Sequence, residues 1–333
     1  MNTSLVITTI NKPNKNIRTF NEKCKKNNWN FIVVGDKKTP KNFFISHGKY
    51  LNIQSQYKTN FKFAHSCPLN NYARKNIGYL EAIKDKADII VETDDDNYPK
   101  NYFFDKKKIQ YKVDEIKNKS WINIYDIFVE KKQFIWPRGL PLTEIFKNKI
   151  KIKKKINGEF YLQQGLSELN PDVDAIYRIV NEKINVKFKS DYKVSLGKSL
   201  STFNSQNTIW FKKIFSLLYL PVTCSMRCTD IWRSLVVLRI LKNDGKKILF
   251  FSTTMHQKRN NHDLINDFKE EIPMYLYNNR IHNILRKLIL KKGERNYISN
   301  LIKCYQALVD NNFLHKKEMK FLNHWIDDLK NLI

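Results

Sequence analysis

Three consecutive aspartates, Asp94, Asp95 and Asp96, lie in the stretch "ADIIVETDDDNYP" of a chain whose formal net charge is +28. In extended backbone, the side chains of Asp94 and Asp96 point to one face and that of Asp95 to the other. Adjacent carboxylates repel one another unless they are solvated or a cation neutralises them. Mg²⁺ and Mn²⁺ prefer such oxygen ligands and leave positions for waters and substrate phosphates. The spacing therefore predicts a divalent-metal site, with a plain acidic turn as the alternative.

The residues before the aspartates predict the element that carries them. The apolar run from Ala87 to Val91 is rich in β-branched residues, which is typical of a strand buried on both faces. "SLVITTIN" and "WNFIVVGD" predict two further strands, and between them Ile17, Phe20 and Cys24 mark one face of a helix. This alternation favours an α/β fold with a mostly parallel, Rossmann-like sheet, whose ligands bind outside the carboxyl ends of its strands.

A helix is expected directly before the acidic strand, and Asn70 or Asn71 can cap it. Arg74 and Lys75 fall near its N-terminus, where backbone N–H groups and the helix dipole favour phosphate. We include Arg74 in the predicted nucleotide-binding site. An ordinary surface position is the alternative for Arg74 and the favoured interpretation for Lys75.

After the acidic cluster, the predicted strands and helices no longer alternate regularly. We expect a strand at "SWINIYDIFV" and a solvated edge strand at "KNKIKIKKKING", with contact to an anionic surface as the alternative for this basic tract. "SQNTIWFKKIFSLLYLPVT" predicts a helix stopped by Pro221, and "TDIWRSLVVLRILKNDG" a helix capped by Thr229 and ended before Gly245. "KKILFFSTT" predicts a strand, and helical periodicity then favours a boundary between an α/β domain at 1–257 and a helical region at 258–333.

Two further groups of side chains could take part in binding. Asp172 and Asp174 repeat the Asp-x-Asp spacing, for which contact with the substrate and capping of the following helix are equal alternatives. His256 and His262 each offer a neutral nitrogen that can complete the shell of a divalent ion, although a lone histidine is more often structural or exposed. We place His256 among the predicted metal ligands and Asp172 and Asp174 among the nucleotide-binding residues.

Asp230 has Arg227 three residues before it and Arg233 three residues after it. Such an arrangement holds a carboxylate ionised and oriented, as a general base or an anchor for an acceptor hydroxyl requires. The alternative is an acidic residue that stabilises the dipole of the helix at its N-terminus. We take Asp230 and Arg233 as candidate catalytic residues.

Composition narrows the class of protein. Sixty Lys and Arg against 32 Asp and Glu could indicate nucleic acid, an anionic membrane surface or a phosphorylated substrate, but the excess lysine is spread along the chain, as on a solvated surface, and no nucleic-acid module is recognised. Five cysteines are too few for a disulfide scaffold and indicate a reducing compartment. Without a charged leader or a long apolar run, we expect a cytoplasmic protein, with peripheral contact to a membrane surface as a further alternative.

Five blocks of the sequence occur in the order found in one known family: "NNYARKNIGYLEAI…ADIIVETDDDNYP", "WINIYDIF…WPRGLPL", "QQGLSELNPDVDAIYRI", "NSQNTIWF…LLYLPVTCSMRCTDIWRSLVVLRIL" and "RNNHDLINDFKEEIPMYL". Over residues 70–276 the chain resembles the STELLO-type glycosyltransferase-like proteins. More distantly, the acidic triplet, the "PDVDA" block and the "DIWR" block are similar to those of the reversibly glycosylated polypeptides, the UDP-arabinopyranose mutases.

The resemblance implies a GT-A fold, in which an Asp-x-Asp pattern holds Mn²⁺ or Mg²⁺ against the diphosphate of a sugar nucleotide. Carried over to this chain, it implies that Asp94, Asp95 and Asp96 form the metal and nucleotide-sugar site. It also implies that Asp230 and Arg233 lie near the acceptor side. The expected function is a metal-dependent glycosyltransferase that uses a nucleoside-diphosphate sugar and a glycan, lipid or protein acceptor. A sugar-nucleotide mutase and a non-catalytic scaffold of a glycan-synthesis complex are the alternatives.

Overall fold

The strands of the described residues form a single sheet. The computed structural model describes residues 1–131, 133–147, 149–181, 183–260 and 263–333. The strands pair in the order β3-β2-β1-β4-β10-β8-β11-β9-β6-β7, and β5 pairs with β11. Their bounds are β1 (Thr3–Thr9), β2 (Asn30–Gly35), β3 (Lys49–Leu51), β4 (Ile89–Asp94), β5 (Asn97–Pro99), β6 (Gln110–Ile116), β7 (Ile152–Glu159), β8 (Leu162–Glu168), β9 (Lys193–Ser195), β10 (Asn207–Phe211) and β11 (Ile248–Gln257).

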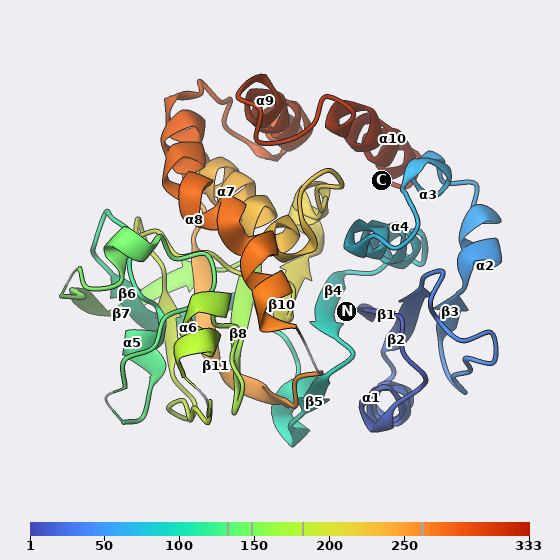
Figure 1. Cartoon of the computed structure of the whole chain (residues 1–333), viewed down its shortest axis with the longest axis horizontal. Helices are drawn as coiled ribbons and strands as arrows, with labels where there is room; N and C mark the ends of the chain where they lie inside the picture. Colours follow the sequence, from blue (N-terminus) through green and yellow to red (C-terminus); the bar gives the residue numbers. More distant parts are fainter. Residues whose placement is uncertain (132, 148, 182, 261–262) are drawn as a thin grey trace.

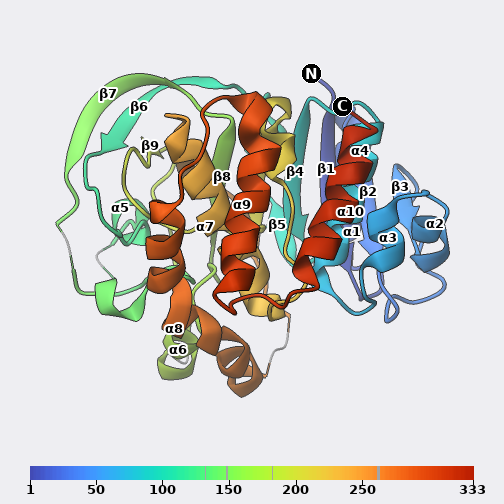
Figure 2. The same cartoon turned by 90° about the horizontal axis from the view of Figure 1, so that it is seen from above.

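Helices cover both faces of this sheet. Figure 1 shows α4, α7, α9 and α10 on one face and α1 on the other, and Figure 2 shows α9 and α10 in front of the strands when the molecule is seen from above. The helices are α1 (Lys15–Lys26), α2 (Ile53–Tyr57), α3 (Lys62–Ser66), α4 (Lys75–Lys84), α5 (Tyr125–Phe128), α6 (Ala175–Val180), α7 (Met226–Asn243), α8 (Leu264–Lys287), α9 (Tyr297–Asp310) and α10 (Glu318–Lys330).

The direction of the strands brings several carboxyl ends to one edge of the sheet. β3, β2, β1 and β4 are parallel neighbours, and β8 and β11 are also parallel to each other. β10 lies antiparallel between β4 and β8, so its amino end meets the carboxyl ends of both. The predicted α/β fold with a largely parallel sheet is confirmed, and the arrangement is consistent with the GT-A type.

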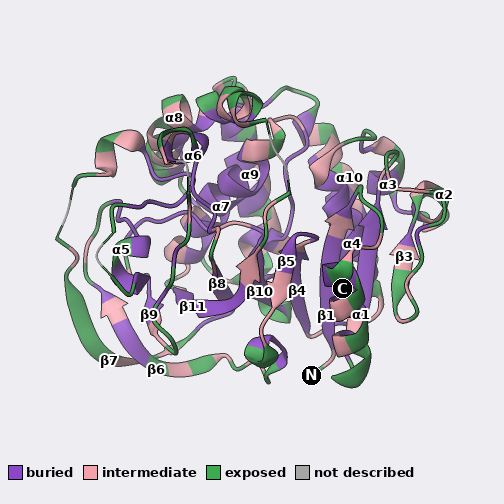
Figure 3. Ribbon diagram, turned by 60° about the horizontal axis from the view of Figure 1, so that its bottom comes forward, coloured by how far each residue is buried: buried purple, intermediate pink, exposed green. Residues whose placement is uncertain are grey.

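Most local predictions for the first hundred residues are confirmed, as is the prediction for the basic tract. β1, α1 and β2 form the expected unit, and Ile17, Phe20 and Cys24 of α1 are buried. Asn71 caps the short 3₁₀ turn that leads into α4, because its Oδ1 accepts a hydrogen bond from Ala73 N at 2.9 Å. The basic tract forms the edge strand β7, which pairs with β6 and is exposed along most of its length (Figure 3).

Three local predictions are wrong. The predicted helix before Pro221 is instead β10 followed by a 3₁₀ turn, because a run buried on both faces has the same apolar pattern in either element. The predicted strand at 120–129 contains α5, and the strand in this part of the chain is β6. Thr229 does not cap α7, which begins earlier at Met226; the Thr229 hydroxyl donates to Ser225 O at 3.1 Å.

The C-terminal helices pack into the same hydrophobic core as the sheet. Met274, Leu301 and Trp325 are buried in the cluster that also contains the residues of β1 and β4. Glu318 of α10 accepts hydrogen bonds from the Tyr219 hydroxyl at 2.6 Å and from other groups in the segment before α7. The hydrophobic core is therefore continuous across residue 258. The division of the chain into two domains at this residue stays a prediction.

Candidate active site

The acidic cluster lies where the central strand β4 ends. β4 pairs with β1 on one side and with β10 on the other, and its last residue is Asp94. Asp95 is tied to the end of β1 and the loop after it, because its Oδ2 accepts hydrogen bonds from Thr9 Oγ1 at 2.5 Å and from Asn11 Nδ2 at 2.9 Å. Asp94 and Asp96 bond to different segments, so the three neighbouring carboxylates have distinct surroundings.

Asp94 lies beside a buried cation. Lys75 Nζ is 3.2 Å from Asp94 Oδ1 and also donates to Thr93 O at 2.9 Å. The Tyr72 hydroxyl donates to the same oxygen of Asp94 at 2.9 Å. Burial raises the pKa of Asp94, and Lys75 and Tyr72 partly offset this effect. The Lys75 side chain is fully buried while that of Asp94 is 32% exposed, so this carboxylate lies at the boundary between core and solvent.

Arg74, which we expected at this position, has other partners. Its guanidinium donates to Gln56 Oε1 at 2.8 and 2.5 Å and to Cys67 O at 2.8 Å. Arg74 still lines the cavity described below, so its contact with a diphosphate stays a prediction. The surface position favoured for Lys75 is wrong, since Lys75 is the cation that contacts Asp94.

Asp96 is buried, and its surroundings favour a cation. Its Oδ2 accepts a hydrogen bond from Gln257 Nε2 at 2.7 Å. Burial and then the charge of Asp94 raise the pKa of Asp96 to about 7. Within the described residues, no three His, Cys, Asp or Glu side chains converge to hold a metal ion. Two carboxylates are nevertheless enough for an ion that keeps waters and binds substrate phosphates, so the donor set fits Mg²⁺ or Mn²⁺.

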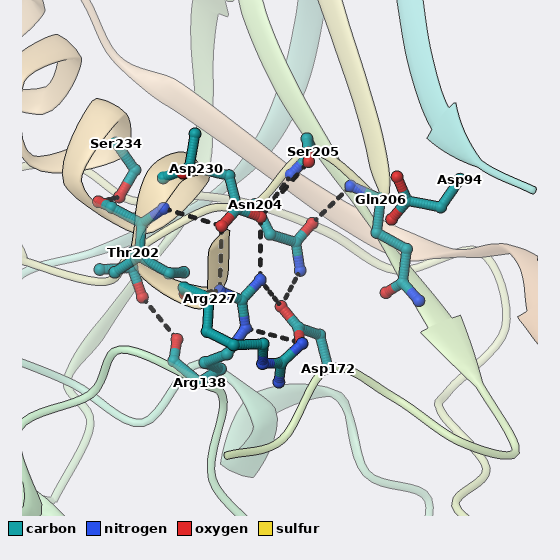
Figure 4. Close-up of polar contacts among 12 residues, drawn as sticks. Asp94, Arg138, Asp172, Thr202, Asn204, Ser205, Gln206, Arg227, Asp230 and Ser234 are labelled. Atoms are coloured by element: carbon teal, nitrogen blue, oxygen red, sulfur yellow. Dashed lines mark hydrogen bonds and ion pairs between the residues drawn. The ribbon is translucent and has the colours of Figure 1, made fainter. Parts of the chain in front are cut away.

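A second polar cluster centres on Arg138, which bridges two aspartates (Figure 4). Its Nε and Nη2 donate to the two oxygens of Asp172 at 2.8 and 2.9 Å. Its Nη1 and Nη2 donate to the two oxygens of Asp230 at 2.9 and 2.8 Å. Asn204 Nδ2 adds a hydrogen bond to Asp172 at 2.7 Å. Asp172 follows β8 and Asp230 lies in α7, so Arg138 joins two separate elements.

The charge of Arg138 determines the protonation of both aspartates. Burial alone would raise the pKa of each carboxyl group. The adjacent guanidinium outweighs burial and holds the pKa of Asp172 and that of Asp230 below their ordinary values. Both carboxylates are therefore ionised at neutral pH, and Asp230 is a better hydrogen-bond acceptor than a proton acceptor.

One hydrogen-bonded chain joins the two clusters. The backbone N–H of Ser205 donates to Asp230 Oδ2 at 3.1 Å, and the Ser205 hydroxyl is 3.3 Å from the same oxygen. That hydroxyl is also 2.5 Å from the hydroxyl of Tyr72, which donates to Asp94. Ser205 shortly precedes the amino end of β10, which is the strand between β4 and β8. Because β10 lies between β4 and β8, Ser205 lies between the two clusters.

A cavity with an open volume of about 510 Å³ contains both clusters. Thr9, Gly35 and Asn70 line its side next to β1 and β2, the three aspartates line its middle, and Asp172 and Asp230 line the side next to β8. Next to β2, Asp36 accepts hydrogen bonds from the backbone N–H groups of Asn70 at 2.8 Å and Asn71 at 3.0 Å. The cavity thus follows the carboxyl edge of the sheet, where α/β proteins bind ligands.

The model of the family "STELLO glycosyltransferases" matches residues 227–333 of the chain. Probable glycosyltransferase STELLO2 of Arabidopsis thaliana is 24% identical over 324 residues, which cover 90% of this chain and 41% of that protein. Probable glycosyltransferase STELLO1 of the same plant is 25% identical over 349 residues, which cover 98% of this chain and 44% of that protein. The chain is similar to the STELLO glycosyltransferases. The resemblance predicted from the sequence blocks is confirmed.

The similarity to STELLO proteins extends beyond the blocks that first indicated it. The family model covers α8, α9 and α10, most of which lie after residue 276. The chain spans less than half the length of the two STELLO proteins from Arabidopsis. Among the described helices, none combines the length and the apolar character that a membrane crossing requires.

Two further candidate residues, Asp174 and Arg233, do not line the cavity. Asp174 caps α6, with its Oδ1 accepting from Tyr177 N at 2.8 Å, so the capping alternative is confirmed for it. The Arg233 guanidinium is fully buried and pairs with Glu92 at 2.7 Å. A catalytic contact of Arg233 stays a prediction and would require this ion pair to open.

The predicted metal ligand His256 does not contact the aspartates in any hydrogen bond of the described residues. The His256 ring stacks on Tyr98 with centroids 5.1 Å apart, and it does not join Asp94 and Asp96 in a metal-binding group of described residues. Its neighbour Gln257 is the residue of β11 that reaches Asp96. His262 lies outside the described residues.

Arg138, Tyr72 and Ser205 are the site residues that the sequence analysis missed. The only signal for Arg138 is its place in "WPRGLPL", where an arginine stands between Pro137 and Gly139 in a segment predicted to turn. Its hydrogen bonds to Asp172 and Asp230 span 34 and 92 residues of sequence, so no local spacing reveals them.

Proposed function

We propose that the chain is a metal-dependent glycosyltransferase that binds a nucleoside-diphosphate sugar in the cavity at the carboxyl edge of the sheet. The observation that carries this proposal is the position of Asp94 and Asp96 at the end of β4, inside a cavity of about 510 Å³. Ligand pockets in proteins commonly measure about 300 to 1,000 Å³, so a nucleotide sugar fits this volume. The relationship to proteins named glycosyltransferases supports the same class of reaction.

The donor has a defined orientation in this proposal. Its nucleoside lies next to β1 and β2, where Asn11 and Asn70 offer polar groups. Its diphosphate lies at Asp94 and Asp96, which would hold Mg²⁺ or Mn²⁺. When bound, such an ion stabilises the negative charge that develops on the departing diphosphate. Tyr72 and Lys75 fix the Asp94 carboxylate, so that its position is set before the donor binds.

The acceptor lies on the side of the cavity next to β8. Asp230 presents an ionised carboxylate there, held in place by Arg138 and Ser205. Because its pKa is low, we propose that Asp230 orients the acceptor hydroxyl by accepting its hydrogen bond rather than by removing its proton. Holding the hydroxyl close to the donor sugar accelerates transfer by restricting the orientation of the two reactants.

Calorimetric titration of the intact chain with UDP, GDP and CMP sugars, each with and without Mn²⁺, tests the proposal. We expect one nucleotide class to bind, with higher affinity when Mn²⁺ is present. Sugar transfer is then measured with candidate glycan, lipid and protein acceptors. Conversion of the donor without any acceptor would instead indicate a sugar-nucleotide mutase, and the absence of metal-dependent binding for every nucleotide would indicate a non-catalytic scaffold.

A further inference from the structure

The cavity wall beyond the aspartates is rich in arginine. Arg138, Arg178, Arg227 and Arg259 all line the cavity together with Asp94 and Asp96. Arg178 lies in α6, Arg227 in the first turn of α7, and Arg259 shortly after β11. These elements follow β8, β10 and β11, so the arginines gather on the side of the cavity away from β1 and β2.

Two of these arginines form ion pairs with acidic residues of α8. Arg227 Nε donates to Glu271 Oε1 at 2.8 Å, and Glu271 also accepts from Ala175 N at 2.7 Å. Arg259 pairs with Asp267. Glu271 and Asp267 are buried, whereas the arginines reach the cavity. Ion pairs of this kind fix the direction of a guanidinium and leave its remaining nitrogens available to a ligand.

Arg178 differs from its neighbours because it lacks an acidic partner. Its side chain is buried and donates to Asn170 Oδ1 and to Pro171 O, at 2.7 Å for the latter. In the described ranges, no carboxylate lies within ion-pair distance of Arg178, and its Nε has no hydrogen-bond partner. Burial, then the charges of Arg259 and Arg227, lower the pKa of Arg178 to about 9. A buried cation in such surroundings is stabilised when an anion binds beside it.

We propose that these arginines bind a second anion, a phosphate or carboxylate group carried by the acceptor, separate from the diphosphate of the donor. This inference rests on the proposed function, which assigns the side of the cavity next to β1 and β2 to the nucleoside and the aspartates to the donor diphosphate. Arg178, Arg227 and Arg259 then face the acceptor. Guanidinium groups bind phosphate and carboxylate through paired hydrogen bonds, so they suit an anionic acceptor of this kind.

The test uses inorganic phosphate as the probe of the second site. Phosphate is titrated into the intact protein in the presence of Mg²⁺ and a saturating concentration of the nucleoside diphosphate, UDP or GDP, that binds most tightly. We expect phosphate to bind without displacing the nucleotide. Arg178→Gln should weaken phosphate binding by roughly tenfold or more and leave nucleotide affinity nearly unchanged. Arg18→Gln, which changes an exposed arginine of α1, is the matched control.

The outcomes separate this inference from the proposed function. If phosphate does not bind, or competes with the nucleotide while Arg178→Gln weakens both, the arginines belong to the donor diphosphate or to no anion, and the inference is wrong. If phosphate binds and requires Arg178 but no nucleoside diphosphate binds, the anion site stands and the proposed function fails. Should Arg178→Gln not fold, Arg259→Gln and the competition experiment on the parent protein decide the question.

Discussion

The hydroxyl groups of Tyr72 and Ser205 lie 2.5 Å apart and join the two polar clusters of the cavity. On one side Tyr72 donates to Asp94, and on the other Ser205 contacts Asp230. The donor and acceptor halves of the proposed site are therefore connected by hydrogen bonds. A substitution in one half should change the energetic effect of a substitution in the other.

This connection predicts that Tyr72→Phe and Asp230→Asn have non-additive effects on the free energy of unfolding. Residues in one hydrogen-bond network typically show coupling energies of about 0.5 to 3 kcal/mol, and distant residues add within about 0.5 kcal/mol. The measurement is a double-mutant cycle in urea. The control cycle pairs Tyr72→Phe with Asp114→Asn, a buried aspartate of β6 that does not line the cavity. Additivity in both cycles would show that the two halves are independent.

Arg138→Gln should strongly destabilise the protein at neutral pH, because it leaves Asp172 and Asp230 buried without their cation. Breaking a buried ion pair in this way costs about 3 to 5 kcal/mol. In the parent, the lowered pKa values mean that the stabilisation is present above the unfolded value of 3.8 and is lost as the pH falls through the folded pKa values.

The same variant should reverse the sign of the pH dependence. Without Arg138, burial should raise both carboxyl pKa values above 3.8, so the variant should gain stability as the pH falls from neutral towards about 5. The check is the free energy of unfolding measured across this range, with the exposed Arg18→Gln as the control. A variant that is as stable as the parent and has the same pH profile would contradict the role given to Arg138.

The acidic cluster and the elements around it could be predicted because their signals are local. The β-branched run before Asp94 indicates a buried strand, and the alternation of strand and helix indicates which end of it meets ligands. The choice between Arg74 and Lys75 could not be made locally. Arg74 ends a 3₁₀ turn and Lys75 begins α4, so the direction of each side chain depends on where the helix starts.

The second cluster could be predicted only in part. The sequence indicates Asp172 and Asp230 as candidates, yet their common partner Arg138 is distant in the chain and lies in a segment without regular structure. The spacing of Arg227 and Arg233 around Asp230 also suggests, wrongly, that both arginines contact this carboxylate. Arg233, further along α7, enters the core to pair with Glu92, while Arg227 lines the cavity. Tertiary packing decides between two such positions.

Asp230→Asn should separate acceptor positioning from donor binding. The asparagine keeps one of the two oxygens that accept from Arg138, and Arg138 keeps its bonds to Asp172. We therefore expect the protein to fold and to bind the donor as the parent does. Sugar transfer should fall by roughly tenfold or more, because a neutral amide oxygen accepts the hydrogen bond of the acceptor hydroxyl less strongly than a carboxylate does.

Donor affinity, thermal stability and transfer rate are measured on the same preparation of Asp230→Asn. Asp114→Asn serves as the control for replacing a buried aspartate with asparagine. A transfer rate equal to that of the parent would remove Asp230 from the acceptor site, even if the stability of the variant were reduced.

The central claim, that Asp94 and Asp96 bind the metal and the donor diphosphate, is tested most directly by titrating Asp94→Asn and Asp96→Asn with the donor nucleotide and Mn²⁺. Both variants should fold, because the amide oxygen introduced by Asp94→Asn can still accept hydrogen bonds from Tyr72 and Lys75, and Asp96→Asn relieves repulsion with Asp94. Metal-dependent nucleotide affinity should fall by roughly tenfold or more in each, a loss of about 1.4 kcal/mol or more. Asp310→Asn, which changes an exposed aspartate at the end of α9, should bind like the parent. Parent-like binding of nucleotide and Mn²⁺ by both Asp94→Asn and Asp96→Asn would contradict the account.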